Sequence, residues 1–110
     1  MTIEHKELAG GRWQAMPFVE QMANIGSEVE RAINWRAKQN NDYSQKAFLR
    51  ALELIDLTLG GLKTFPRLKE LARVREALVD DFFGVNEYKS TDESWRKYFL
   101  QFAYAARKNH

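Results

Sequence analysis

The sequence predicts an all-α domain, an antiparallel up-down four-helix bundle with an N-terminal arm, and three patterns in its 110 residues lead to this prediction. Apolar residues recur three and four positions apart through four long segments, as on the buried face of a helix. No segment alternates apolar and polar residues with a period of two, as a half-buried strand does. The breaks between segments are short, and short connections join antiparallel neighbours. We therefore expect an arm over residues 1–15 and a bundle over residues 16–110.

Each expected helix starts and stops at a recognisable signal. Proline stands at the start of the first and third helices, where its missing N–H is tolerated. Short polar sequences that resemble capping boxes stand at the start of the second and fourth helices, and glycines follow the second and third helices. The helices are expected at about 16–38, 43–59, 66–83 and 91–107, with Asp42, Gln45, Ser90 and Glu93 in the boxes and Gly60, Gly61 and Gly84 as stops.

The apolar stripes of these helices form the expected core. Gly26 lies beside the first stripe. Glycine weakens a helix by about 1 kcal/mol relative to alanine, so the close approach of another helix is the expected reason for it. The stripes contain Phe18, Met22, Ile25, Val29, Ala32 and Ile33; Ala47, Phe48, Ala51, Leu52, Leu54, Ile55, Thr58 and Leu59; Leu68, Leu71, Ala72, Leu78, Val79 and Phe82; and Trp95, Tyr98, Phe99, Phe102 and Ala106.

Composition argues against several kinds of chemistry. The chain contains no cysteine, which excludes disulfides and thiolate chemistry and is consistent with a reducing compartment. The two histidines, His5 and His110, lie near the ends, so we expect no histidine-based catalysis, no metal site and no cofactor. No apolar run approaches the ~20 residues of a membrane span, and no signal peptide is apparent. We expect a cytoplasmic protein that does not enter a membrane.

Glu53 and Asp56 form the one carboxylate pattern that points to an enzyme. Their E-x-x-D spacing resembles half of the magnesium site of the all-α nucleotide pyrophosphohydrolases of the MazG type. That family also carries an E-x-x-E on the preceding helix, which Glu20, Glu28 and Glu30 do not provide. The other interpretation is that both carboxylates make ordinary charge pairs along a helix. A magnesium-dependent nucleotide hydrolase is therefore kept as an alternative function.

Arg75 breaks the apolar pattern of the third helix, because it falls near the centre of the stripe. Arginine is rarely buried without a partner, so we expect a carboxylate from another helix beside it. Glu28, Glu53 and Asp56 are the candidates, since each lies at or near the margin of its own apolar face. Arg75 and its carboxylate partner would form a buried ion pair, or Arg75 would line a polar cavity that binds an anion. The third possibility is that the Arg75 guanidinium extends into solvent.

Three large side chains fall outside the apolar stripes and are interface candidates. Trp35 lies on a polar line of the first helix, and Leu100 and Tyr104, one turn apart, point away from the stripe of the fourth. The arm, through Trp13, is one expected cover for Trp35, and another subunit is the alternative, since aromatic residues are enriched at interfaces. Trp13 is itself a further interface candidate. Because a short arm cannot easily cover both helices, the pattern favours self-association.

Several stretches of the sequence resemble those of a known family. They are residues 22–32, 50–58 and 67–71, Tyr98 with Phe99, and Phe102 with Ala103. They resemble a family of small all-α bacterial proteins to which no function is assigned. The length, the bundle layout and the tripeptide Ala23-Asn24-Ile25 resemble, more loosely, the four-helix intervening-sequence proteins. The first likeness implies no activity, and the second implies a fold and a tendency to assemble.

The balance of charge gives little support to a nucleic-acid partner. The net charge is only +2, and lysines and arginines are spread over every helix. Arg67, Lys69 and Arg73 would provide an RNA-binding face, but acidic residues share that face. We therefore expect a non-enzymatic binding or scaffolding protein that acts as a homo-oligomer, with itself or another protein as partner, and keep an RNA-binding bundle as the alternative.

Overall fold

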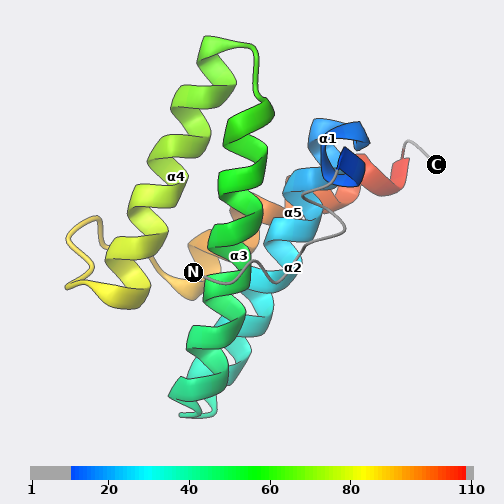
Figure 1. The fold of residues 1–110 in the computed structure, drawn as a ribbon. Coiled ribbons are helices and arrows are strands. Elements are labelled where there is room, and N and C mark those ends of the chain that lie inside the picture. The colour runs from blue at the N-terminus through cyan, green and yellow to red at the C-terminus, as the bar shows by residue number, and fades with distance from the viewer. Residues whose placement is uncertain (1–10, 109–110) are drawn as a thin grey trace.

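The computed structural model describes residues 11–108, which form helices and contain no strand, so the all-α prediction is confirmed. A three-residue helix, α1, precedes four long ones (Figure 1). The helices are α1 (Trp13–Ala15), α2 (Phe18–Ala37), α3 (Asn41–Gly61), α4 (Phe65–Phe83) and α5 (Asp92–Lys108).

The ends of the long helices lie close to the predicted positions, but other residues cap them. Asn40, not Asp42, caps α3, because its side-chain oxygen accepts a hydrogen bond of 3.1 Å from the Tyr43 N–H. At the start of α5, Thr91 and Ser94 exchange hydrogen bonds between each side-chain oxygen and the other's N–H, in place of the expected box from Ser90 to Glu93. Gly60 and Gly61 continue the last turn of α3 instead of stopping it.

α3 runs antiparallel to α2, and α4 antiparallel to α3, but the helices do not close into the expected bundle (Figure 1). The α2–α3 hairpin is the most extensive contact, and α4 returns along α3. α5 crosses α2 obliquely (Figure 1). It reaches α4 through the hydrogen bonds of Trp95 to Asp81 and of Tyr98 to Glu70. An up-down four-helix bundle is therefore not confirmed.

Gly26 is the point where α5 lies against α2. A Cβ atom at Gly26 would lie 2.8 Å from Cβ of Phe99, which is closer than van der Waals contact allows. The Phe99 side chain consequently packs directly on the α2 backbone. The predicted close approach at Gly26 is confirmed, and it fixes where the two helices meet.

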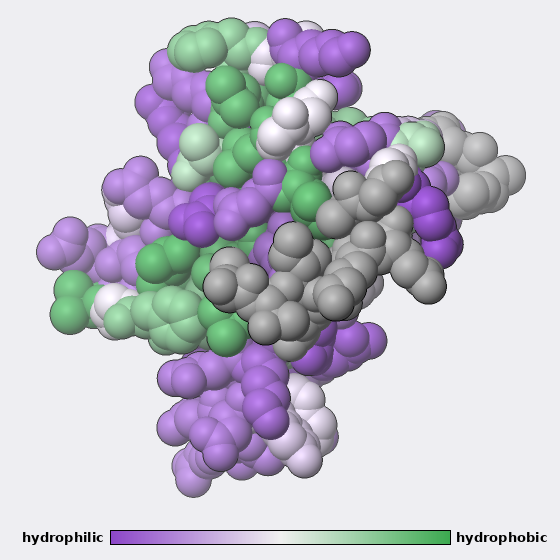
Figure 2. Space-filling model, in the orientation of Figure 1, coloured by the Kyte–Doolittle hydropathy of each residue, from purple (hydrophilic) through white to green (hydrophobic). Residues whose placement is uncertain are grey.

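The core is centred on α2 and α3, and the expected stripes of these helices supply most of it. α4 contributes less than expected: Leu71 and Leu78 are buried, whereas Leu68 and Ala72 are exposed. The far end of the α2–α3 hairpin is coated by hydrophilic residues, while apolar residues emerge beside α3 and α4 (Figure 2). The largest fully buried side chains are Trp13, Phe48, Met22, Ile25, Ile33, Ile55, Leu71, Leu78 and Val29.

Trp13 belongs to this core and not to a loose arm. Its side chain is completely buried, and Nε1 donates a hydrogen bond of 2.9 Å to Oγ1 of Thr58 on α3. The amide of Gln21 donates to the Trp13 carbonyl oxygen at 2.9 Å, which ties α1 to α2. Trp13 is therefore unavailable as the interface residue that the sequence suggested. Residues 1–10 of the expected arm lie outside the described residues.

Candidate functional site

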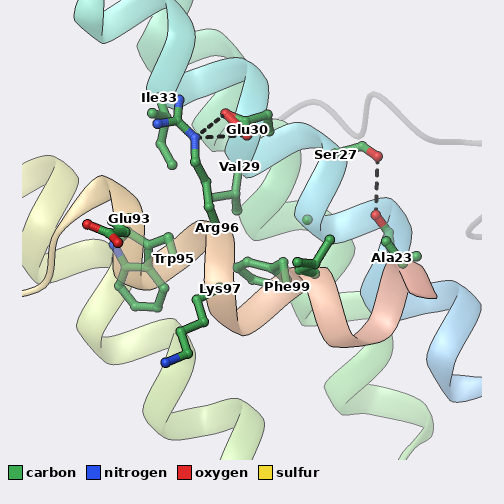
Figure 3. A pocket seen from close by; sticks show the side chains of 13 residues that line it. Ala23, Ser27, Val29, Glu30, Ile33, Glu93, Trp95, Arg96, Lys97 and Phe99 are labelled. Atoms are coloured by element: carbon green, nitrogen blue, oxygen red, sulfur yellow. Dashed lines mark hydrogen bonds and ion pairs between the residues drawn. The ribbon is translucent and has the colours of Figure 1, made fainter. Parts of the chain in front are cut away.

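A groove of about 740 Å³ runs between α2 and α5. Small residues of α2 line it near the point where the two helices approach closely, at Gly26 and Phe99. In Figure 3, Phe99 and Trp95 lie beneath α2, and Ala23 and Ser27 line the opposite wall. The groove is thus an open, mainly apolar depression whose shape follows from the crossing of the two helices.

Charged residues surround this groove, and one ion pair spans it. Arg96 of α5 contacts both carboxylate oxygens of Glu30 on α2, at 2.9 and 3.0 Å, and donates to Oδ1 of Asn34 at 3.1 Å (Figure 3). Glu93 and Lys97 are exposed and also line the groove. Both signs of charge are present, so the rim is not a dedicated site for anions or cations.

Leu100 and Tyr104 stand exposed on α5 beside the groove. Each side chain is 61% exposed, and Leu100 contributes to the groove lining. A second hollow, of about 470 Å³, shares Ala23, Ser27 and Ala103 with the first and extends to Arg107. The predicted outward direction of Leu100 and Tyr104 therefore places them along a surface that is hollowed on one side.

Trp35, the third interface candidate, is partly covered within its own chain. The ring of Tyr43, at the start of α3, packs edge-on against the Trp35 ring with centroids 4.9 Å apart. Nζ of Lys38 lies 5.2 Å from the centre of the same ring. Trp13, the expected cover, instead lies against Thr58. Trp35 therefore contributes to the α2–α3 turn and is no longer a main interface candidate.

Arg75 pairs with a carboxylate of another helix, but at the surface. Its Nε donates to Oδ1 of Asp56 at 2.7 Å, and the two side chains are 37% and 47% exposed. This hydrogen bond raises the pKa of Arg75. The buried face of α4 is centred on Leu71 and Leu78, which places Arg75 at its edge. A buried pair or an Arg75-lined cavity is therefore wrong for this residue.

Of the other two carboxylates proposed for Arg75, Glu28 is held by different arginines. Glu28 instead accepts hydrogen bonds from Arg31 at 3.0 Å and from Arg50 at 3.3 Å. Glu53 lies half-buried on α3. Sequence reasoning therefore included the right partner, Asp56, among its candidates, but it could not select this residue, because the choice depends on how α4 is rotated against α3.

Among the ion pairs between described residues, the pair of Arg36 and Asp81 is the most buried, and it is not one of the pairs expected from the sequence. Asp81, with its side chain 8% exposed, accepts hydrogen bonds from Arg36 at 3.2 and 3.4 Å and from Nε1 of Trp95 at 2.9 Å. Arg36 also donates to Asp92 at 2.8 Å and lies 3.9 Å over the Phe82 ring. Burial lowers the pKa of Arg36, but the hydrogen bonds to Asp81 and Asp92 outweigh it and leave the pKa raised.

These contacts join α2, α4 and α5 at one point, so the Arg36–Asp81 pair has a structural role. A signal for it exists in the sequence, since Arg36 follows Val29 and Ile33 at the helical spacing of the buried face. The partner could not be named in advance, because it lies 45 residues away.

Two residues of the alternative functions, Asp56 and Arg67, make contacts within the chain. Asp56 is held by Arg75, and the described part of the chain contains no group of three or more His, Cys, Asp or Glu residues that could hold a metal ion. The guanidinium of Arg67 lies 4.5 Å over the Phe18 ring. Among residues 11–108, no helix is both long and apolar enough to span a bilayer.

Comparisons with protein-family models, with curated proteins and with solved structures found no match. The family and fold resemblances noticed in the sequence therefore stay predictions.

Proposed function

We propose that this protein is a non-enzymatic helical binding or scaffolding protein of the cytoplasm that acts as a homo-oligomer through the outer face of α5 and the adjoining α2–α5 groove. The observation that supports it best is the pair of side chains Leu100 and Tyr104, each 61% exposed and one helical turn apart. Isolated exposed apolar residues are common on monomers. Here two lie one turn apart, and Leu100 also lines a mainly apolar hollow of about 740 Å³, which together make a larger apolar surface.

Covering this surface would stabilise an assembly appreciably. Full burial of a leucine side chain contributes about 1.5–3 kcal/mol, and a tyrosine carries a comparable apolar area together with a hydroxyl that tolerates water at an interface rim. A two-fold assembly buries each such residue twice, so the contribution is doubled without any further contact.

The test is the mass of the protein in solution. We expect sedimentation or light scattering at tens of micromolar to give a mass above the 12.9 kDa of one chain. Leu100→Ser combined with Tyr104→Ser should shift the equilibrium to the monomer. Val85→Ser is the matched control, because Val85 is 81% exposed but lies in the α4–α5 connection. A wild-type mass that stays at one chain over this range would refute the proposal.

The salt dependence of RNA affinity distinguishes the alternative role, RNA binding, from the scaffolding role. A phosphate-binding protein loses affinity steeply as salt rises, because it releases counterions. We expect no retention of a single-stranded RNA at physiological salt. Retention that weakens with salt and is lost in the double variant Lys69→Glu, Arg73→Glu would replace the scaffolding proposal by the RNA-binding one.

Nucleotide hydrolysis is the second alternative and has its own assay. With Asp56 paired to Arg75, we expect no Mg²⁺-dependent turnover of nucleoside triphosphates. Turnover that Glu53→Gln abolishes would favour the hydrolase.

A further inference from the structure

The outer face of α5 forms a line of side chains at heptad spacing with Leu100 at its centre. Glu93, Leu100 and Arg107 are seven residues apart and fall nearly on one line along the helix, and Lys97 and Tyr104 form the neighbouring line. All five are exposed. Such a seam is the surface that a second helix contacts when it packs along α5.

The charges along this seam are polarised from one end of α5 to the other. Asp92 and Glu93 lie in the first turn, and Arg107 and Lys108 in the last. A parallel pair of α5 helices would place Glu93 beside Glu93 and Arg107 beside Arg107, which is unfavourable. An antiparallel pair centred on Leu100 places Glu93 beside Arg107 twice and also opposes the helix dipoles. The sequence of α5 is therefore complementary to itself in one orientation.

We propose that two copies pair through α5, antiparallel about a two-fold axis at Leu100, an inference that rests on the proposed homo-oligomeric function and specifies its geometry. In this arrangement Leu100 contacts Leu100 of the second copy. Residues four positions either side of Leu100 also face one another, so Arg96 meets the Tyr104 ring of the second copy in a cation–π arrangement. Every contact occurs twice, as an isologous interface requires.

The groove explains why the contact occurs on this side of α5. Leu100 lies on the edge of the hollow, and the small residues Ala23, Ser27 and Ala103 leave space next to it. A leucine projecting from the second copy fills that space without displacing any side chain. The mixed charges of the rim, with Glu30 already satisfied by Arg96, suit a second copy better than a partner of one sign of charge.

The extent of the contact predicts a reversible dimer. The 17 residues of α5 span about 26 Å at 1.5 Å per residue. A strip of that length and one helix wide lies at or below the ~800 Å² per partner of a standard interface. We therefore expect dissociation in the micromolar range, within reach of sedimentation and crosslinking.

Single cysteines test the geometry, because the chain has none of its own. With a short bis-maleimide, Leu100→Cys should crosslink to itself. Glu93→Cys alone and Arg107→Cys alone should not, since in an antiparallel pair the two copies of either residue lie ~21 Å apart along the helix. A mixture of Glu93→Cys and Arg107→Cys should give a mixed dimer. Val85→Cys, exposed elsewhere, sets the background level of crosslinking.

Charge reversal gives a second measurement of the same contact. Glu93→Arg or Arg107→Glu alone should weaken the dimer about tenfold, since each replaces two opposite-charge contacts by two like-charge contacts. Mixing the two single variants should restore the affinity, because the mixed dimer regains both opposite-charge contacts.

The outcomes distinguish the two proposals. A protein that is monomeric throughout overturns both. A dimer in which Glu93→Cys crosslinks alone, or in which Leu100→Cys does not, overturns the antiparallel pairing and leaves the homo-oligomeric function in place.

Discussion

Among single residues, Asp81 joins three helices, because its carboxylate on α4 accepts hydrogen bonds from Arg36 of α2 and Trp95 of α5. We expect Asp81→Ala to lower the free energy of unfolding by about 2–3 kcal/mol. The substitution removes the carboxylate that accepts hydrogen bonds from the half-buried Arg36 and from the indole N–H of Trp95. Arg36 retains Asp92, which keeps the loss below the range for a fully isolated buried charge. Denaturant melts measure the change. A loss below 1 kcal/mol would contradict the structural role given to Asp81.

Asp56→Ala is the matched control for this prediction. Asp56 and Arg75 form a closer ion pair than Arg36 and Asp81, but with side chains 47% and 37% exposed both are well solvated. An exposed pair contributes about 0–1 kcal/mol, so the loss on removing Asp56 should fall in that range. The contrast between the two substitutions separates the effect of burial from that of distance.

Gly26 and Gly60 give a matched pair of glycines within helices. We expect Gly26→Ala to destabilise the protein by about 1–3 kcal/mol, since the new Cβ would lie 2.8 Å from Cβ of Phe99, an atom that can move away only together with the α5 backbone. Gly60→Ala places its Cβ in open space and should stabilise by up to about 1 kcal/mol through helix propensity. Thermal unfolding of both variants checks the sign of each effect, and a gain at Gly26 would show that α5 is free to move away from α2.

At the scale of whole helices, local signals predicted most of the fold. Proline, polar caps and apolar spacing placed the four long helices within a few residues, because these signals act over one or two turns. The tilt of α5 was not predictable in this way. It depends on Gly26 accepting Phe99 and on Arg36 reaching Asp81 and Asp92, contacts between residues far apart in the chain.

In the candidate site too, features set within one helix could be predicted, and features set by contacts between helices could not. The outward direction of Leu100 and Tyr104 follows from helical periodicity alone, so the sequence identified both. The groove beside them exists only once α2 and α5 cross, and no spacing within one helix encodes a crossing. Trp35 illustrates the opposite case, since its cover, Tyr43, lies eight residues away across a turn whose geometry the sequence does not specify.

Tyr98 links α5 to α4 and makes that contact sensitive to alkaline pH. Burial, and then the hydrogen bond of 2.9 Å from its hydroxyl to Glu70, raise the pKa of Tyr98 well above the ordinary value near 10. Its contribution to stability is therefore complete below pH ~10 and declines above it, by up to ~1.4 kcal/mol per pH unit, as the unfolded chain ionises first. Tyr98→Phe should flatten this decline in denaturant melts, whereas Tyr104→Phe, on an exposed position, should leave it unchanged.

On the scale of the whole molecule, self-association should couple to folding stability. If only folded chains pair, raising the free protein from well below the dissociation constant to a hundred times that constant adds about 2.7 kcal/mol by mass action. For a domain of this size, 1 kcal/mol shifts the melting temperature by roughly 4–8 °C. We therefore expect the wild-type melting temperature to rise on the order of 10 °C over that concentration range.

The variant carrying Leu100→Ser and Tyr104→Ser should melt at one temperature throughout. It should also match the wild type at the lowest concentration, because both side chains are exposed in the monomer and their loss removes no core contact. A variant that melts lower than the wild type even in dilute solution would mean that Leu100 and Tyr104 stabilise the single chain, and a concentration-independent wild-type melt would mean that they meet no second copy.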